Sequence, residues 1–221
     1  MAKKKILIVN TASAGHEENA DSIKGLLKRT NHKILSYRDI GSFEDVRDYD
    51  GIILSGQPVS DRSHSKTSVR KKYPWIKKVN VPMIGFCGGH QIIAVTYGAE
   101  VIKNKEAEPK GYFAAYAKGR HLDDPILKGI RFGKYGNTFI VYNKHTDSVT
   151  LPEDFKLLAE TDRCYNTLMK HRRKPIYGAQ FHPDDPDFYR RELGINQGSN
   201  QDSDTMVENF ERIVVEQSAK C

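Results

Sequence analysis

Cysteine is scarce in this sequence. Only three cysteines occur among 221 residues, Cys87, Cys164 and Cys221, and no two of them form a CxxC pair. Because three cysteines cannot all pair with one another, the spacing indicates neither a disulfide framework nor a zinc knuckle. We therefore expect reduced thiols, no metal site and no bound cofactor.

Long hydrophobic runs are also absent. The opening MAKKKILIVN is basic, but only Ile6, Leu7, Ile8 and Val9 follow before Asn10, too few for a signal-peptide core or a membrane span. We therefore expect a cytoplasmic protein. No internal repeat, low-complexity segment or linker stands out, and with 38% hydrophobic and 29% charged residues the composition predicts one globular domain over residues 1–221.

No RNA- or DNA-binding motif accompanies the excess of basic residues. Lysine and arginine number 35 against 28 aspartates and glutamates, a net charge of +7. Such a charge could attract nucleic acid, a nucleotide or an acidic partner surface. Solvated basic faces are the simpler interpretation, because the basic clusters are not part of an RNA- or DNA-binding motif with interleaved aromatic residues. We expect no nucleic-acid partner. The basic clusters are Lys3–Lys5, Arg70–Lys72, Lys77–Lys78 and Lys170–Lys174.

The first half of the chain alternates apolar strands with helical patterns. Four segments, KKILIVN, HKILSY, YDGIILSGQP and VPMIGFC, have the apolar content of buried strands, and Ala20, Ile23, Leu26 and Leu27 recur at helical spacing between the first two. Buried strands joined by crossovers predict an α/β fold. The expected sheet is open, mostly parallel and flavodoxin-like, with helices on both faces.

The second half has a different pattern. Short strands separated by turns are expected from about residue 99 to residue 180, as an extension of the same sheet, in GYFAAYA, NTFIVYN, FKLLAE, NTLMK and PIYGAQF. The end, SDTMVENFERIVVEQ, predicts an amphipathic helix with Ser203 or Asp204 as its N-cap. The polar stretch between, DDPDFYRRELGINQGSNQDSD, predicts a surface loop.

Gly85, Cys87 and Gly89 form G-x-C-x-G where a strand passes into a helix. This is the cysteine counterpart of the nucleophile elbow G-x-S-x-G, in which glycines permit a tight turn that exposes the nucleophile. A thiol at a helix N-terminus lies near unpaired backbone N–H groups, which favour the thiolate and could receive an oxyanion. The alternative is a small buried thiol beside closely packed glycines.

Histidine could supply the base that a cysteine nucleophile needs. His182 ends the segment PIYGAQF and His145 follows NTFIVYN, so both are expected at the carboxyl edge of the sheet, where ligands gather in open α/β folds. His90 is expected to point along the helix that follows Cys87. The other histidines, taken as solvated, are His16, His32, His64, His121 and His171.

Two further features could complete such a site. Asp184, two residues after His182, could orient the imidazole as the acid of a triad, or could begin a surface run of acids. Gly56, Gln57 and Pro58 end another strand, and a backbone N–H there could contribute to an oxyanion hole. An ordinary Gly/Pro turn is the alternative.

Taken together, GFCGGHQ at 85–91 and YGAQFHPD at 177–184 resemble the two signatures of class I glutamine amidotransferases, G-x-C-x-G-x-Q and a later F-H-P-E. The segment Lys144–Val149 is similar to the S-H-x-D-x-V segment in the amidotransferase part of GMP synthetases. The resemblance implies that Cys87 is the nucleophile, His182 the general base and acid, and Asp184 the orienting acid. It further implies that the backbone of Gly88, Gln57 and Gly56 holds the oxyanion, and that the substrate is contacted by Gln91, His145, Thr146 and Asp147.

The implied activity is hydrolysis of glutamine to glutamate and ammonia through a Cys87 thioester. The chain departs from the family pattern at Asp184, where the family has Glu, and at Gln57, where it has Gly. No P-loop-like ATP segment follows, so the implied partner is a separate synthetase, such as one that aminates XMP. Two alternatives stay open. One is a γ-glutamyl hydrolase or peptidase with the same chemistry, and the other is a catalytically silent regulatory relative.

Overall fold

A nine-stranded sheet forms the centre of the molecule in the computed structural model, which describes residues 2–12, 18–56, 65–103, 111–134, 136–183 and 201–217. Its strand order is β2-β1-β3-β4-β11-β10-β9-β6-β7. A separate two-stranded sheet pairs β5 with β8. The strands are β1 Lys5–Asn10, β2 Asn31–Ser36, β3 Gly51–Leu54, β4 Met83–Phe86, β5 Val101–Lys103, β6 Gly111–Ala117, β7 Thr138–Asn143, β8 Asp147–Val149, β9 Phe155–Glu160, β10 Leu168–His171 and β11 Ile176–Ala179.

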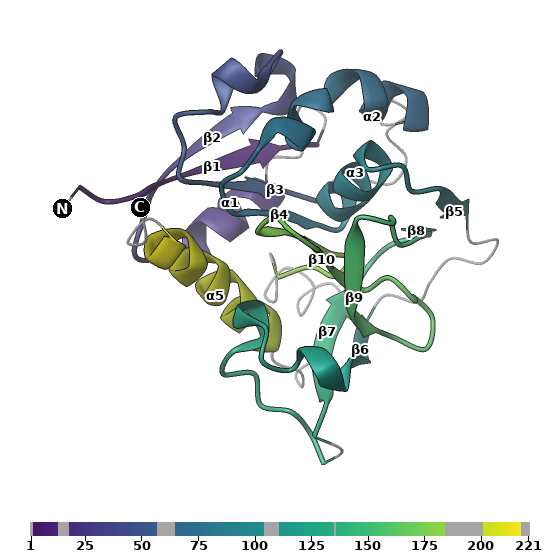
Figure 1. Cartoon of the computed structure of the whole chain (residues 1–221). Coiled ribbons are helices and arrows are strands. Elements are labelled where there is room, and N and C mark those ends of the chain that lie inside the picture. The colour runs from purple at the N-terminus through teal and green to yellow at the C-terminus, as the bar shows by residue number, and fades with distance from the viewer. Residues whose placement is uncertain are drawn as a thin grey trace.

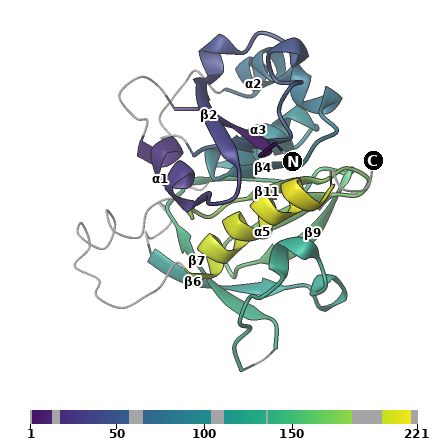
Figure 2. The same cartoon turned by 90° about the vertical axis from the view of Figure 1, so that its left-hand side faces the viewer.

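Helices cover both faces of the sheet (Figures 1 and 2). Because successive side chains of a strand point to opposite faces, Ile6 and Ile8 of β1 enter one core cluster and Leu7 and Val9 the other. Helices α1 and α5 pack on the first face, and α2 and α3 pack on the second. Within the described residues, the α-helices are α1 Glu18–Leu26, α2 Lys66–Lys72, α3 Gly88–Thr96 and α5 Gln201–Gln217, and the 3-10 helices are Tyr37–Asp39, Phe43–Asp45, Pro74–Lys78, Gly119–His121 and Pro125–Leu127.

The sheet changes character along its width. Neighbouring strands from β2 to β11 run parallel, whereas the pairs from β11 through β10, β9 and β6 to β7 are antiparallel. The predicted fold class is confirmed, including the β-rich extension of the same sheet. Among the described residues, no helix is both long and apolar enough to cross a membrane.

Local expectations differ from the structure in two places. The N-cap predicted at Ser203 or Asp204 is wrong, because α5 already begins at Gln201 and Ser203 is fully buried inside it. The small sheet of β5 and β8 was not predicted, since each of its strands is only three residues long. It brings residues 147–149 against residues 101–103, and α3 packs against β8.

Candidate active site

Cys87 lies at a sharp turn between β4 and α3. Its backbone has φ 46° and ψ −106°, and it is the one non-glycine residue with positive φ in the described part of the chain. A side chain in this region is strained, and such strain is found most often at functional sites. The backbone N–H of Cys87 donates to Ala179 O at 2.8 Å, and its carbonyl accepts from Gln91 N at 3.1 Å. The turn is therefore fixed to β11 on one side and to α3 on the other.

The two glycines around Cys87 are required by packing. A Cβ on Gly85 would stand 2.8 Å from the backbone nitrogen of His90, and one on Gly89 would stand 2.7 Å from Leu54 Cβ and closer still to Leu54 O. Real Cβ atoms do not come this close to neighbouring atoms. Helix α3 therefore rests directly on β3 and β4, which gives the elbow little freedom.

His182 lies three residues after the end of β11, the parallel neighbour of β4. Ala179 of β11 pairs with Phe86 of β4, so the residues that follow these two strands emerge at the same edge of the sheet. The backbone N–H of His182 donates to Tyr142 O at 2.9 Å, which ties the corner after β11 to β7. His182 is 4% exposed and Cys87 is 1% exposed.

Gly56 lies between these two side chains. A Cβ built on Gly56 would stand 3.2 Å from His182 Cε1 and 3.6 Å from Cys87 Cβ. The same point lies 3.0 Å from Nδ2 of Asn19, on α1. Thr11 holds this corner, since its Oγ1 donates to Ser55 O at 2.8 Å. The ends of β1, β3, β4 and β11 thus meet around one small space.

The structure describes two of the three predicted oxyanion donors, Gly56 and Gly88. Gly88 opens α3, and its N–H belongs to the first turn of the helix, where backbone N–H groups have no partner within the helix. Gly56 follows β3 and is buried. Gln57 and the orienting acid Asp184 lie outside the described residues, so their roles stay predictions.

The predicted substrate wall is held by hydrogen bonds of side chains. Gln91 Nε2 donates to Asp147 O at 2.7 Å, and His145 Nδ1 lies 3.2 Å from the same oxygen. Gln91, Thr146 and Asp147 are half-buried, and His145 is buried. The fold therefore brings Gln91 and the 145–147 segment together.

Two buried residues near the site were not given a role from the sequence. Gln180 is fully buried, and its Oε1 accepts from Gln91 Nε2 at 3.2 Å. His90 was expected to point along its helix, but its ring packs against β11, with Nδ1 2.6 Å from where a Cβ on Gly178 would stand. Burial lowers the pKa of His90 to about 3, with a smaller effect of the nearby His145 in the same direction, so the ring is neutral. A polar residue inside the apolar run before His182 was the available signal for Gln180.

The histidines expected to be solvated divide into three groups. His171 is buried, against expectation, with its ring edge-on to Phe155 and Tyr97 at centroid distances of 5.2 and 5.3 Å. Its Nδ1 accepts from Arg173 N and Lys174 N, which closes the turn between β10 and β11. His32 and His121 are half-buried, and His16 and His64 lie outside the described residues.

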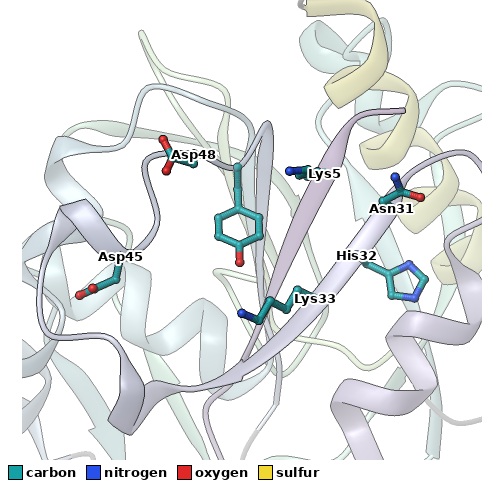
Figure 3. A pocket seen from close by; sticks show the side chains of 7 residues that line it. Lys5, Asn31, His32, Lys33, Asp45 and Asp48 are labelled. Atoms are coloured by element: carbon teal, nitrogen blue, oxygen red, sulfur yellow. The ribbon is translucent and has the colours of Figure 1, made fainter. Parts of the chain in front are cut away.

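A cavity of about 480 Å³ lies elsewhere on the molecule, at the amino ends of β1 and β2 (Figure 3). Because Cys87 and His182 follow the carboxyl ends of β4 and β11, this cavity is at the opposite edge of the parallel strands. The carboxylate of Asp45 already accepts from Gly41 N and Ser42 N. The lining residues are Lys5, Asn31, His32, Lys33, Asp45, Asp48 and Tyr49.

The fold and the cysteine elbow are those expected of a class I glutamine amidotransferase. Comparison with a family model gives the same class. Residues 18–186 match the model of the family described as glutamine amidotransferase class-I. The chain belongs to this family. The predictions of the family and of an amide-hydrolysing enzyme class are thereby confirmed.

Individual proteins that are similar to this chain have more specific names than the family. A glutamine-hydrolyzing GMP synthase subunit of Archaeoglobus fulgidus is 35% identical over 156 residues, which cover 69% of this chain and 74% of that protein. The protein of the same name from Methanothermobacter thermautotrophicus is 39% identical over 140 residues, 62% of this chain and 67% of that one. A crystal structure of a putative GMP synthase subunit from Thermoplasma acidophilum has a TM-score of 0.75 at 24% identity, covering 99% of this chain and 98% of that one, and it supports the fold.

Proposed function

We propose that this chain is the glutamine-hydrolysing subunit of a two-subunit GMP synthase. The observation that carries the proposal is the strained Cys87 elbow, with Cys87 Cβ and His182 Cε1 both within 3.6 Å of one point beside Gly56. The names of the relatives support the choice of synthase. A single domain over residues 1–221 is part of the proposal, supported by the continuous sheet.

In the proposed reaction the Cys87 thiolate attacks the side-chain carbonyl carbon of glutamine. Backbone N–H groups of Gly88 and of the Gly56–Gln57 corner receive the oxyanion. His182 then protonates the departing ammonia, and a γ-glutamyl thioester is left on Cys87. Water deprotonated by His182 attacks the thioester and releases glutamate, which returns the thiol to its starting state.

Asp184 is proposed to orient the His182 ring, as the third member of a triad. Gln91, His145, Thr146 and Asp147 are proposed to line the pocket for the amino-acid end of the substrate. The hydrogen bonds from Gln91 and beside His145 to Asp147 O support this arrangement.

The proposed partner is a separate synthetase that accepts the ammonia and aminates XMP. The basic residues Lys77 and Lys174 lie away from the site, where Lys174 Nζ donates to Lys77 O at 2.7 Å near the amino ends of β4 and β11. Docking of the synthetase is expected instead at the edge that carries Cys87, because ammonia leaves there.

Intact-mass spectrometry after exposure to a diazo-ketone analogue of glutamine tests the chemistry. The expected result is one adduct that maps to Cys87 and is blocked by excess glutamine. An unmodified Cys87 at saturating analogue, both alone and with a candidate synthetase, would mean a catalytically silent relative. Turnover of γ-glutamyl conjugates but not of glutamine would identify the peptidase alternative.

A further inference from the structure

Gln180 is a buried carboxamide whose side chain makes a single hydrogen bond among the described residues. It is fully buried, and its backbone N–H donates to Thr167 O at 2.9 Å. Its side-chain Oε1 accepts from Gln91 Nε2 at 3.2 Å. Burying a carboxamide is unfavourable compared with burying an apolar side chain of similar size. The stability of the core therefore gives no reason for glutamine at this position.

The contact fixes the orientation of the Gln91 carboxamide. Asp147 O is a backbone carbonyl and can only accept, so the group 2.7 Å from it must be Nε2 of Gln91. The second N–H of Nε2 goes to Gln180 Oε1. Both donors of Gln91 are thus engaged, and no described residue donates to its Oε1.

Gln91 is well placed to use that oxygen. It lies four residues after Cys87, the residue that caps α3, and so about one helical turn along the helix from the cysteine. A carboxamide that rotated by half a turn would offer its N–H groups in place of the oxygen, and would then repel an N–H group of the substrate. Holding one orientation therefore selects a ligand that donates at this point.

We propose that Gln180 is a positioning residue that locks the Gln91 carboxamide with Oε1 toward the substrate, where it accepts an N–H of the amino-acid substrate. The inference rests on the proposed function, because it gives Gln91 its ligand. It extends that function by stating what Gln91 recognises, which is an N–H group of the substrate.

The variants Gln180→Met and Gln180→Glu separate the hydrogen bond from the packing. Methionine keeps the approximate volume and removes the acceptor, whereas glutamic acid keeps an acceptor oxygen, because burial favours its neutral form. The rate of Cys87 alkylation by the diazo-ketone analogue is measured against analogue concentration. This gives an apparent binding constant KI and a limiting rate constant kinact.

The expected result for Gln180→Met is a KI raised about tenfold with kinact within twofold of the wild type. A tenfold change in KI is the size expected when one hydrogen bond is lost and the Gln91 carboxamide is no longer held in one orientation. Gln180→Glu should restore KI to within about threefold. Alkylation by iodoacetamide, which has no amino-acid end, should proceed at the wild-type rate in both variants. An unchanged KI in Gln180→Met overturns the proposal. A joint loss of kinact and of iodoacetamide reactivity also overturns it, since that would show general damage to the elbow.

A second measurement does not depend on activity. Solvent exchange of the two side-chain amide protons of Gln91, followed by NMR, should be slow in the wild type and in Gln180→Glu, and at least about tenfold faster in Gln180→Met. Equal exchange in all three proteins overturns the positioning role. If the wild-type Cys87 is never alkylated, the proposed function fails, and the exchange rates still decide the role of Gln180.

Discussion

The two walls of the candidate site are built in different ways. The wall that carries Cys87 is held by backbone: Gly85 and Gly89 let α3 rest on β3 and β4, and the Cys87 N–H donates to Ala179 O. The second wall, residues 145–147 where they meet Gln91 of α3, is held by side-chain hydrogen bonds. A backbone-held wall cannot accept an added methyl group, whereas a side-chain-held wall can be altered one contact at a time. In the proposed function, this difference separates the placement of the nucleophile from the recognition of the substrate.

The largest expected effect comes from removing the two proposed reacting groups, one on each side of Gly56. Cys87→Ala and His182→Ala should each lower glutamine hydrolysis by at least about 10³-fold, because nucleophile and base act as a unit. Both variants should keep the fold, as judged by circular dichroism and thermal unfolding. Asp184→Asn should show a partial loss. A variant that hydrolyses glutamine at the wild-type rate would remove that residue from the proposed mechanism.

The next largest effect tests the backbone-held wall directly. Gly89→Ala should destabilise the protein by about 3 kcal/mol or more, because its Cβ would overlap the backbone of Leu54, which cannot move without shifting β3. The free energy of unfolding is measured with urea.

Gly56→Ala is the matched control for that substitution. Its Cβ would meet only side chains, at 3.0 Å or more, so the expected loss of stability is under about 1 kcal/mol. Activity should nevertheless fall about tenfold, because the methyl group enters the space between Cys87 and His182. Equal losses of stability in the two variants would mean that contact with the Leu54 backbone is not what makes Gly89 intolerant of a methyl group.

The sequence was sufficient for the features that depend on local pattern. Buried apolar runs predicted β1, β3, β4 and β11, and the paired motifs around Cys87 and His182 predicted which strand ends meet, because parallel neighbours share an edge. The backbone-held wall was therefore predictable: the glycines that permit it stand beside the cysteine.

The second wall was less predictable, because it depends on contacts between distant segments. Gln91 and Asp147 are 56 positions apart, and Gln91 and Gln180 are 89 apart. No local sequence pattern distinguishes a buried glutamine that orients a neighbouring side chain from a glutamine that merely ends a strand. The prediction for His171 was wrong for the same reason: the other four residues of 170–174 are basic, but its ring packs on Phe155 and Tyr97.

A smaller effect is expected from the buried imidazole behind the side-chain-held wall. Burial holds the pKa of His90 at about 3, far below the ordinary value of 6.5. The unfolded chain therefore takes up a proton between these values that the folded chain does not, and stability falls as the pH drops below about 6.5. This histidine should contribute a loss of about 1.4 kcal/mol between pH 7.5 and pH 5.5.

Urea unfolding of the wild type and of His90→Gln at the two pH values measures that contribution. The variant lacks the titrating group, so its stability should change by about 1.4 kcal/mol less than that of the wild type. The same pH dependence in both proteins would mean that His90 is protonated in the fold.

The smallest effect concerns strain at the elbow itself. With φ 46° and ψ −106°, residue 87 has a conformation that glycine adopts readily and other residues do not. Cys87→Gly should therefore be more stable than Cys87→Ala by about 1 kcal/mol, although glycine loses more chain entropy on folding. The pair Lys71→Gly and Lys71→Ala, at an exposed position of α2, should show the opposite order by a similar amount. If both positions favoured alanine, the elbow would be unstrained.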